Sequence, residues 1–486
     1  MLKLKEDGYD GVARVGLGPF GEFFFLQSAD AVKSVTLDQA DAFPRRFSVP
    51  LFETLELDRG IVYEQGEQHR ANKRRCVPSF ENTRAMKTFL EAVQVGLDAE
   101  APSPLPTLRP PSPSLPQVEL DALSARWQRA GARDADGLRV DLYAEMRRLT
   151  LDVVLRVTFG LSDDGDGVNR DELSETIGAY LERIVATANE IPPLWQISPR
   201  LSGNYVAVVD ELLPRLRALV GDAIAARRRL LDAATPAAAG DGDDDARRAD
   251  PGGGAASRAD LLSALVADPT LDDDAIRSIL FDLVIAGSDT TASTLTAALY
   301  LLHEPRHASA LARARAEARD ARGARDVDLE GYRAALPYST AVAREILRLY
   351  PPVPFIGRVA TAEAVVAQTR LREGAVACWS PWFLGRDRAA WGADAGEFAP
   401  GRWLDDATTG GAPSTFSWLP FGAGPRGCLG TRLGLTEAVV GVTRLLDDFE
   451  FTFENDGALP VRYDLTLNLD GVARCRVRAR QAAAEI

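Results

Sequence analysis

The sequence predicts a mainly helical protein with a small β-rich lobe near its N-terminus. One observation is that apolar residues recur with helical spacing over three long segments, 140–161, 206–231 and 272–302. The other is that residues 11–18 and 23–27 flank the turn signal Gly18-Pro-Phe-Gly21, which is typical of a β-hairpin. No internal repeat is found, and we expect a single domain over residues 1–486.

Composition limits the classes of function. The apolar content of 46% suffices for a large core, and the formal net charge of −14 argues against nucleic acid as a partner. Four cysteines without a CxxC pair and three scattered histidines predict neither a disulfide framework nor a histidine-based metal site.

No run of about 18 apolar residues and no signal peptide occurs in the chain. We therefore expect an intracellular protein without a transmembrane span, cytoplasmic or peripheral on a membrane. If an N-terminal segment is missing, the endoplasmic reticulum or a plastid is the alternative location.

Three features are predicted in the N-terminal part. Ser28 is a candidate N-cap for a helix through Leu37. Residues 43–58 contain two prolines and scattered aromatics and are expected to form a loop. Residues 65–80 have the character of a basic helix, which in the simplest interpretation is only a solvated face. Its basic run includes His69, Lys73, Arg74 and Arg75.

Two stretches of low complexity interrupt the helical pattern. Residues 101–117 contain seven prolines and are expected to be extended. Residues 233–260 mix Ala, Gly and Asp and cannot bury enough apolar surface to order themselves. We interpret both as disordered surface insertions and not as domain boundaries, because neither half of the chain carries a site of its own.

The segment 272–302 holds polar residues in the middle of a long apolar helix, in the run Ala286-Gly-Ser-Asp289-Thr290-Thr291. Glycine and hydroxyl residues are poor helix formers. A mid-helix Ser or Thr can bond the carbonyl four residues back and bend the helix, which opens a groove. The alternative is a helix whose polar face simply meets water.

Glu345 and Arg348 are spaced i, i+3 and share one face of a predicted helix. By itself such a pair is most often an exposed salt bridge that stabilises little. The pair is followed by Tyr350-Pro-Pro-Val-Pro and, further on, by Phe398-Ala-Pro-Gly-Arg402-Trp403.

The stretch Phe421-Gly-Ala-Gly-Pro-Arg426-Gly-Cys428-Leu-Gly430 places one cysteine among four glycines. Glycines allow the backbone to turn with positive φ and to approach a flat ligand closely. Unpaired N–H groups at the start of the following helix favour a thiolate at Cys428. Cys428 is thus the natural axial ligand for a metal, and the alternative is an ordinary cysteine in a glycine-rich turn.

These motifs, in this order, resemble those of the cytochrome P-450 family. The Cys428 loop matches Phe-x-x-Gly-x-Arg-x-Cys-x-Gly at every specified position. Residues 286–291 resemble the family's Ala/Gly-Gly-x-Asp/Glu-Thr-Thr motif, and residues 345–348 its Glu-x-x-Arg motif. The run Trp391-Gly-Ala-Asp-Ala-Gly-Glu-Phe398 and the Cys428 loop look most like those of eukaryotic, lipid-oxidising branches, with no subfamily assigned.

The resemblance implies the cytochrome P-450 fold, with haem b (iron protoporphyrin IX) between the helix 272–302 and the Cys428 loop. Cys428 would be the iron ligand, and a thiolate there favours O–O cleavage. Thr290 would steady dioxygen and relay protons that Asp289 feeds from solvent. The other implied cofactor-binding residues are His69, Lys73, Arg358, Phe421, Arg426 and Gly430.

The resemblance also implies a buried structural triad of Glu345, Arg348 and Arg402. The implied substrate pocket is apolar, and the alternative is that its residues are plain core. Its residues would be Ile285, Ala286, Val353, Phe355, Ile356 and Leu467.

The implied reaction is a monooxygenation that inserts one oxygen atom from O2 into an apolar substrate, for example by lipid or isoprenoid hydroxylation. Electrons would come from a separate NAD(P)H-dependent flavoprotein reductase or ferredoxin. It would dock near four basic residues, Lys73, Arg74, Arg75 and Arg432. The alternatives are a haem-thiolate isomerase or dehydratase of lipid peroxides, which needs no NAD(P)H, and a non-enzymatic haem sensor without turnover.

Overall fold

The structure is a computed structural model, and its description covers most of the chain. It describes residues 11–16, 22–48, 51–52, 59–81, 115–131, 136–160, 169–190, 192–234, 260–321, 334–404, 414–454, 461–463, 466–469 and 474–480. The chain divides into two compact units. Unit 1 comprises Met1–Ser48, Met86–Thr150 and Gly287–Ile486, and unit 2 comprises Val49–Ala85 and Leu151–Ala286.

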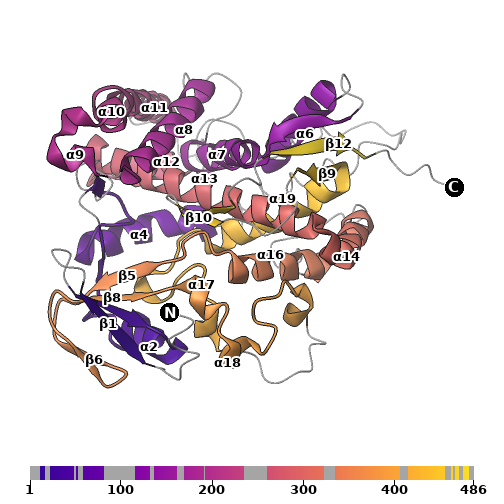
Figure 1. Cartoon of the computed structure of the whole chain (residues 1–486). Helices are drawn as coiled ribbons and strands as arrows, with labels where there is room; N and C mark the ends of the chain where they lie inside the picture. The colour runs from indigo at the N-terminus through magenta and orange to yellow at the C-terminus, as the bar shows by residue number, and fades with distance from the viewer. Residues whose placement is uncertain are drawn as a thin grey trace, which may run out of the picture. The chain divides into compact units, whose positions relative to one another are not determined.

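Unit 1 contains the predicted β-rich lobe (Figure 1). Its sheet has the strand order β1-β2-β8-β5-β3. These strands are β1 (Val12–Gly16), β2 (Glu22–Leu26), β8 (Val376–Trp379), β5 (Ile356–Val359) and β3 (Arg45–Arg46). Strands β1 and β2 are antiparallel neighbours, as the hairpin prediction requires, while β2 and β8 run parallel.

Strand β3 corrects the prediction that residues 43–58 are loop. Arg45 and Arg46 pair antiparallel with Val359 and Arg358 of β5. The partner strand is remote in the sequence, and two arginines carry no strand signal of their own. Only the tertiary fold makes this short pairing possible.

One helix packs on the lobe where the N-cap prediction put it. Ser28 accepts a hydrogen bond from the backbone N–H of Ala31 at 3.2 Å and caps α2 (Ala29–Lys33). The helix continues as a π-helical turn, Ser34–Asp38. Buried apolar residues join α2 to the sheet, among them Val32, Phe43 and Trp379.

The helical part of unit 1 is built around the second part of α13 (Asp273–His303). Its core joins Leu295 and Leu299 of α13 to Ile346 and Leu446. The helices involved are α6 (Leu115–Gly131), α7 (Leu142–Phe159), α14 (Ala308–Asp320), α16 (Pro337–Leu349) and α19 (Thr431–Asp448). Helices α14 and α16 both pack on α19, as Figure 1 shows.

Short elements complete unit 1. The helices α17 (Pro381–Leu384) and α18 (Arg388–Trp391) lie between β8 and the Cys428 loop in sequence. The other strands are β4 (Leu138–Asp141), β6 (Ala364–Val366), β7 (Thr369–Leu371), β9 (Phe449–Phe453), β10 (Val461–Tyr463), β11 (Leu467–Leu469) and β12 (Arg474–Ala479). They form the sheets β4-β12-β9, β10-β11 and β6-β7. Strand β4 takes the first residues of the predicted helical segment 140–161.

Among the described residues of unit 2, the regular elements are helices, joined by turns, and no strand occurs. Unit 2 contains the first part of α13 and the end of α7. Its other helices are α4 (Gly66–Glu81), α8 (Arg170–Ala188), α9 (Leu194–Ile197), α10 (Gly203–Val206), α11 (Leu213–Ala234) and α12 (Leu261–Val266). A π-helical segment, Ala207–Leu212, joins α10 to α11.

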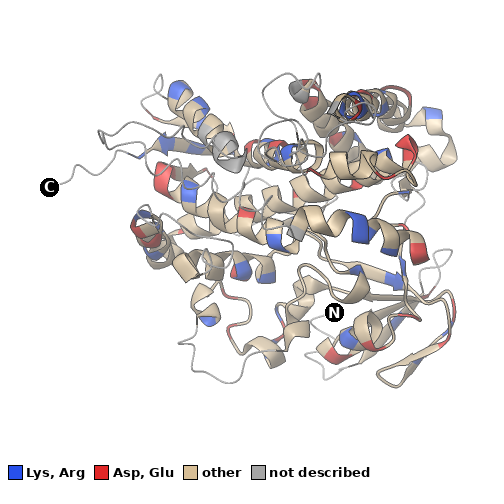
Figure 2. Cartoon of the chain, turned by 180° about the vertical axis from the view of Figure 1, so that it is seen from behind, with Lys and Arg blue, Asp and Glu red and all other residues tan. Residues whose placement is uncertain are grey.

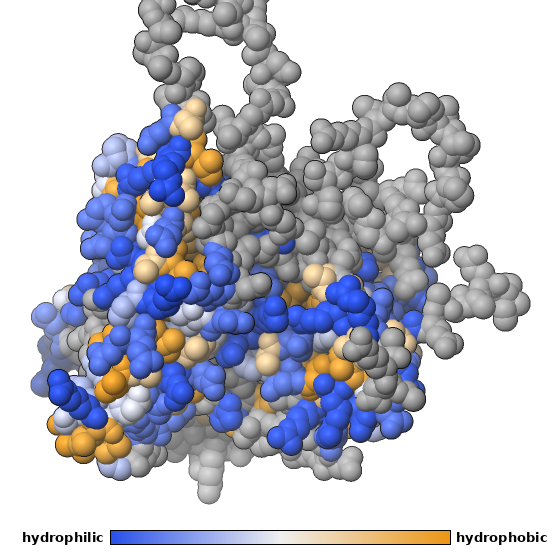
Figure 3. All heavy atoms as spheres, turned by 90° about the horizontal axis from the view of Figure 1, so that it is seen from above, coloured by the Kyte–Doolittle hydropathy of each residue, from blue (hydrophilic) through white to orange (hydrophobic). Residues whose placement is uncertain are grey.

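Figure 3 shows one face of the whole chain. Among the described residues on this face, apolar side chains form small groups between polar ones.

The two predicted insertions are shorter than the sequence suggested. Residues 115–117 already belong to α6, and α11 reaches Ala234. Asp260 caps α12 by accepting a hydrogen bond from the N–H of Ser263 at 2.8 Å. The remaining parts of these insertions, 101–114 and 235–259, lie outside the described residues.

Among the helices that the structure describes, none is both long and apolar enough to span a bilayer.

Candidate active site

The Cys428 loop is closed by its own backbone. The N–H of Cys428 donates to the carbonyl of Phe421 at 2.8 Å, and the N–H of Gly427 donates to Gly424 O at 2.9 Å. Helix α19 starts three residues after the cysteine, and Gly430 at its N-cap offers no side chain to the first N–H groups. These donors at the helix start are therefore directed toward the cysteine end of the loop.

One glycine of the loop, Gly424, lies so close to another backbone segment that it cannot carry a side chain. Gly424 has a φ of +68°, and a Cβ on it would lie 1.9 Å from the carbonyl oxygen of Thr36. Any side chain at this position would collide with backbone in the π-helical turn that follows α2. The loop and the β-rich lobe are thus locked together at this glycine.

Cys428 differs from the other three cysteines of the chain. Cys428 is exposed, whereas Cys76, Cys378 and Cys475 are buried, and none of the four forms a disulfide. Burial raises the pKa of each of these three thiols to about 12, which keeps them protonated and unreactive. Cys428 is the cysteine that a ligand can reach.

Three arginines, Arg46, Arg358 and Arg426, gather next to the Cys428 loop. Arg358 is 3% exposed and Arg426 is 7% exposed. Burial lowers the pKa of Arg358 well below its usual value, and the charges of Arg46 and Arg426 lower it further. Arg46 donates to Arg426 O at 2.9 Å, and Arg426 donates to Pro44 O at 3.0 Å.

This arrangement suits an anionic cofactor. Buried positive charges that repel one another are costly unless a counter-charge enters, and the propionates of haem would supply it. No group of three His, Cys, Asp or Glu side chains among the described residues could hold a metal. A metal that brings its own macrocycle and needs only one protein ligand fits these residues.

Helix α13 presents the predicted polar motif, and its hydroxyls bond their own helix. Thr291 Oγ1 donates to Gly287 O at 3.3 Å, and Thr294 Oγ1 donates to Thr290 O at 2.9 Å. Thr290 itself is half-buried. The structure thus contains the backbone-bonding threonines that the sequence predicts for this segment.

Asp289 lies mostly inside the protein, and its feeding of protons from solvent stays a prediction. Its side chain is 6% exposed. The hydroxyl of Tyr143 on α7 donates to Oδ1, and the hydroxyl of Thr466 donates to Oδ2 at 2.5 Å. Two segments remote in sequence cover the carboxylate, and the sequence alone did not indicate either of them.

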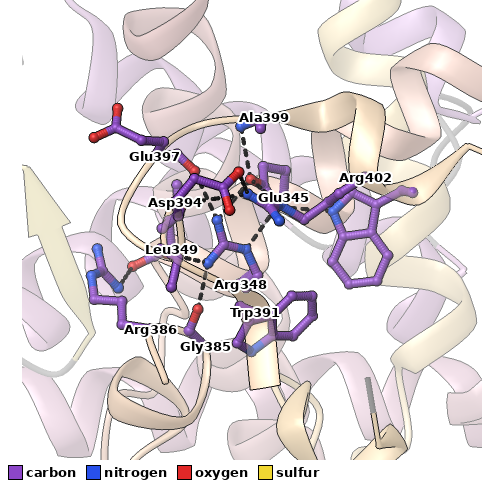
Figure 4. A network of polar contacts seen from close by, with 12 residues as sticks. Glu345, Arg348, Leu349, Gly385, Arg386, Trp391, Asp394, Glu397, Ala399 and Arg402 are labelled. Carbon is purple, nitrogen blue, oxygen red and sulfur yellow. Dashed lines mark hydrogen bonds and ion pairs between the residues drawn. The ribbon is translucent and has the colours of Figure 1, made fainter. Parts of the chain in front are cut away.

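The predicted triad residues lie in contact (Figure 4). Arg348 donates to both oxygens of Glu345 at 2.7 and 2.8 Å, and Arg402 Nε donates to Glu345 at 3.0 Å. Trp403 Nε1 and the N–H of Ala399 also donate to Glu345, at 2.9 and 2.8 Å.

Arg348 extends this cluster into the chain that precedes the Cys428 loop. Its guanidinium donates to Glu397 O at 2.8 Å and also to the carbonyls of Gly385 and Ala395. The side chains of Glu345 and Arg348 are both fully buried. The charges of Glu345 and Arg348 therefore depend on partners inside the protein.

The predicted pocket residues do not share one environment. Val353 and Phe355 are 36% and 47% exposed, which argues against a plain core role for them. Leu467 is buried, Ile356 and Ile285 are half-buried, and Ala286 is exposed. The predicted cofactor residues His69 (buried) and Lys73 (half-buried) lie one turn apart on α4 of unit 2.

Four residues near the site were missed from the sequence: Arg46, Tyr143, Glu437 and Thr466. Glu437 carried a signal, because it is the one acidic residue in the apolar run 435–442 of α19. It is buried, and burial raises its pKa to about 8 although it is hydrogen-bonded to Thr291. The other three come from segments whose approach only the fold determines.

The profile of the cytochrome P450 family matches residues 114–470. Protein LUTEIN DEFICIENT 5, chloroplastic, from Arabidopsis thaliana is 26% identical over 93% of this chain and 69% of its own length. Self-sufficient cytochrome P450 monooxygenase CYP505E4 from Penicillium freii is 29% identical over 74% of this chain but only 31% of its own length.

The fold agrees with these matches. A crystal structure of a cytochrome P450DA mutant heme domain superposes with a TM-score of 0.72 at 22% identity, and the match covers 99% of this chain and 92% of that one. The profile match extends over more than half of the chain. The chain therefore belongs to the cytochrome P450 family of haem-thiolate monooxygenases, oxidoreductases that incorporate oxygen.

Proposed function

We propose that this protein is a haem b monooxygenase acting on an apolar lipid or isoprenoid substrate, with Cys428 as the iron ligand. The observation that carries the assignment is the exposed Cys428 beside Arg358 and Arg426, two buried arginines whose positive charges repel one another. Bound haem would supply dioxygen binding and oxygen-transfer chemistry. A single catalytic domain over residues 1–486 is part of this proposal.

Each residue then has a defined task. Cys428 would hold the haem iron as a thiolate, which the start of α19 favours. Arg358 and Arg426 would pair with the propionates, as would His69 and Lys73 of α4, while Phe421 and Gly430 would shape the loop. Thr290 would offer its hydroxyl as a hydrogen-bond donor at the oxygen-binding face, and Asp289 would supply protons to it.

The triad of Glu345, Arg348 and Arg402 has a structural task, because it orients the chain before the Cys428 loop. The substrate would contact the exposed apolar side chains of Val353 and Phe355. Ile285, Ala286, Ile356 and Leu467 complete the proposed pocket. Electrons would come from a separate NAD(P)H-dependent reductase or ferredoxin.

The ligand assignment is tested by the absorption spectrum of the reduced, carbon-monoxide-treated protein. We expect the red-shifted Soret band of thiolate-ligated haem in the wild type and its loss in Cys428→Ser. The matched control is Cys378→Ser, because Cys378 is buried and donates to Phe24 O at 3.7 Å, which serine can also do. Retention of the band in Cys428→Ser would refute the assignment.

The substrate class is tested by titrating the protein with fatty acids, isoprenoids and sterols and following the Soret band. A spectral shift from an apolar compound, together with NAD(P)H-dependent product formation, supports a monooxygenase. Conversion of a lipid peroxide without NAD(P)H would instead identify an isomerase or dehydratase.

A further inference from the structure

The carboxylate of Asp289 is held from two sides. Tyr143 OH donates to one oxygen, and Thr466 Oγ1 donates to the other at 2.5 Å. Thr466 is 3% exposed and Asp289 is 6% exposed. A carboxylate with a hydroxyl donor on each oxygen is fixed in orientation, because rotation would break both bonds inside the protein.

The Thr466 side of this arrangement is itself anchored. Leu467 N donates to Pro352 O at 2.8 Å, and Ser293 Oγ donates to Leu467 O at 2.5 Å. Asp289 and Ser293 are spaced i, i+4 on α13, so they lie on one face and hold adjacent residues of the same segment. Leu467 belongs to the proposed substrate pocket, so the acid and the pocket share one segment of chain.

The Tyr143 side is anchored as well. Thr150, two turns further along α7, donates to Ser288 O of α13 at 2.8 Å, and the two helices lie side by side in Figure 1. Burial, and then the charge of Asp289, raise the pKa of Tyr143 above its usual value. The phenol therefore keeps its proton and remains a hydrogen-bond donor to Asp289.

We propose that Tyr143 and Thr466 are positioning residues that orient Asp289 for proton delivery during oxygen activation. The inference rests on the proposed function, since it assigns the partners of the acid in that reaction. Neither hydroxyl changes its own protonation in this role. Proton transfer requires a donor within hydrogen-bond reach and in the correct orientation. The proton enters from water at the small exposed part of the Asp289 side chain, which is 6% exposed, and passes from Asp289 toward Thr290. The two hydroxyls set the orientation of Asp289 for this transfer.

The test compares Tyr143→Phe and Thr466→Val with the wild-type holoenzyme, which is given its redox partner and a turned-over substrate. We expect product formed per NAD(P)H oxidised to fall by roughly three- to tenfold in each variant, with an increased solvent deuterium isotope effect. Thr466→Ser keeps the hydroxyl and should restore coupling. Thr158→Val is the matched control, because it removes a buried hydroxyl of α7 that donates to Val154 O at 2.7 Å and takes no part in holding Asp289.

A second readout does not depend on activity. If Tyr143 acts through Asp289, the thermal unfolding midpoint should fall in Tyr143→Phe and in Asp289→Asn, and the double variant should lose less than the sum of the two. The proposal would be overturned by additive losses of stability in the double variant. It would also be overturned if Tyr143→Phe and Thr466→Val formed as much product per NAD(P)H oxidised as Thr158→Val. The proposed function would fail separately, through loss of the thiolate spectrum or of NAD(P)H-dependent turnover in the wild type.

Discussion

Burial gives side chains of the same type different protonation and accessibility in this protein. Three thiols are buried, with pKa values raised to about 12, while Cys428 is exposed at the start of a helix. The same contrast separates Glu437, which lies inside the packing of α19 on α13, from the many acidic residues at the surface. Residue type alone does not distinguish these cases.

Glu437 should make the stability of the protein depend on pH. Its folded pKa is raised from 4.5 to about 8 by burial, so folding favours its protonated form. Its contribution is fully present below about pH 4.5 and is lost as the pH rises through 8. Between these two pH values the free energy of unfolding of the wild type should decrease by roughly 3–5 kcal/mol because of this group. The Glu437→Gln variant should not show this decrease.

The measurement is chemical unfolding of the wild type and Glu437→Gln from pH 5 to pH 8.5. The free energy of unfolding of the wild type should fall relative to that of the variant as the pH increases. Glu373→Gln, at an exposed position, should show no such relative change. Parallel pH profiles for the wild type and Glu437→Gln would contradict the prediction.

At the scale of elements, the Cys428 loop and the chain before it are each held by contacts with another element. The Cys428 loop meets the turn after α2 at Gly424. The chain before this loop is held by Glu345 and Arg348 of α16, which bond Arg402, Trp403 and backbone carbonyls. Both contacts join elements that are remote in sequence, so they act only after the surrounding helices have packed.

Gly424→Ala should destabilise the protein by about 2 kcal/mol or more, because the new methyl group meets Thr36 O and the positive φ becomes strained. Thermal unfolding and haem retention after gel filtration would measure the effect. Gly396→Ala is the matched control, since a Cβ there has no neighbour within 4 Å. Equal unfolding midpoints for the two variants would exclude this close contact.

Glu345→Ala should cost roughly 3–5 kcal/mol, because it strands the buried charge of Arg348 and removes the acceptor of Arg402. Denaturant unfolding measures this loss. The control is Glu363→Ala, whose ion pair with Arg370 is exposed and should contribute less than about 1 kcal/mol. Similar losses in both variants would mean that burial does not strengthen the α16 cluster.

At the scale of the whole molecule, charge governs how a partner would approach. The net charge is −14, and basic and acidic residues are interspersed on the face shown in Figure 2. The basic run of α4 is partly neutralised: Arg74 bonds Glu67 at 2.9 Å, and Arg75 bonds Asp268 at 2.6 Å. Hydrogen bonds from Thr270, and then Arg75, lower the pKa of Asp268 to about 2.

A reductase or ferredoxin is proposed to dock near Lys73, Arg74, Arg75 and Arg432. Two of these, Arg74 and Arg75, already pair with acidic residues of this chain. Replacing Arg74 and Arg432 by Gln should slow electron transfer from the partner several-fold at low salt and flatten its salt dependence. Stopped-flow reduction measures both. Arg370→Gln, at an arginine as exposed as Arg74, should leave the rate unchanged, and an unaffected Arg74/Arg432 double variant would remove this docking proposal.

Much of the fold could be predicted because its signals are local. Helix α13 was predicted as 272–302 and runs from Asp273 to His303, since apolar residues recur with helical spacing on both sides of its polar centre. Ser28 caps α2 as expected. Strand β3 and the helical ends of the two insertions were missed, because pairing with a distant strand and packing against other helices override weak local preference.

The sequence by itself determined the family, the long polar-centred helix and the cysteine loop, because each is a contiguous motif whose chemistry can be read from neighbouring residues. Only the tertiary structure decided that Asp289 is buried under Tyr143 and Thr466 and that Arg46 joins Arg358 and Arg426. The physical reason is that burial and hydrogen bonding depend on distances between segments far apart in the chain, which no local pattern encodes.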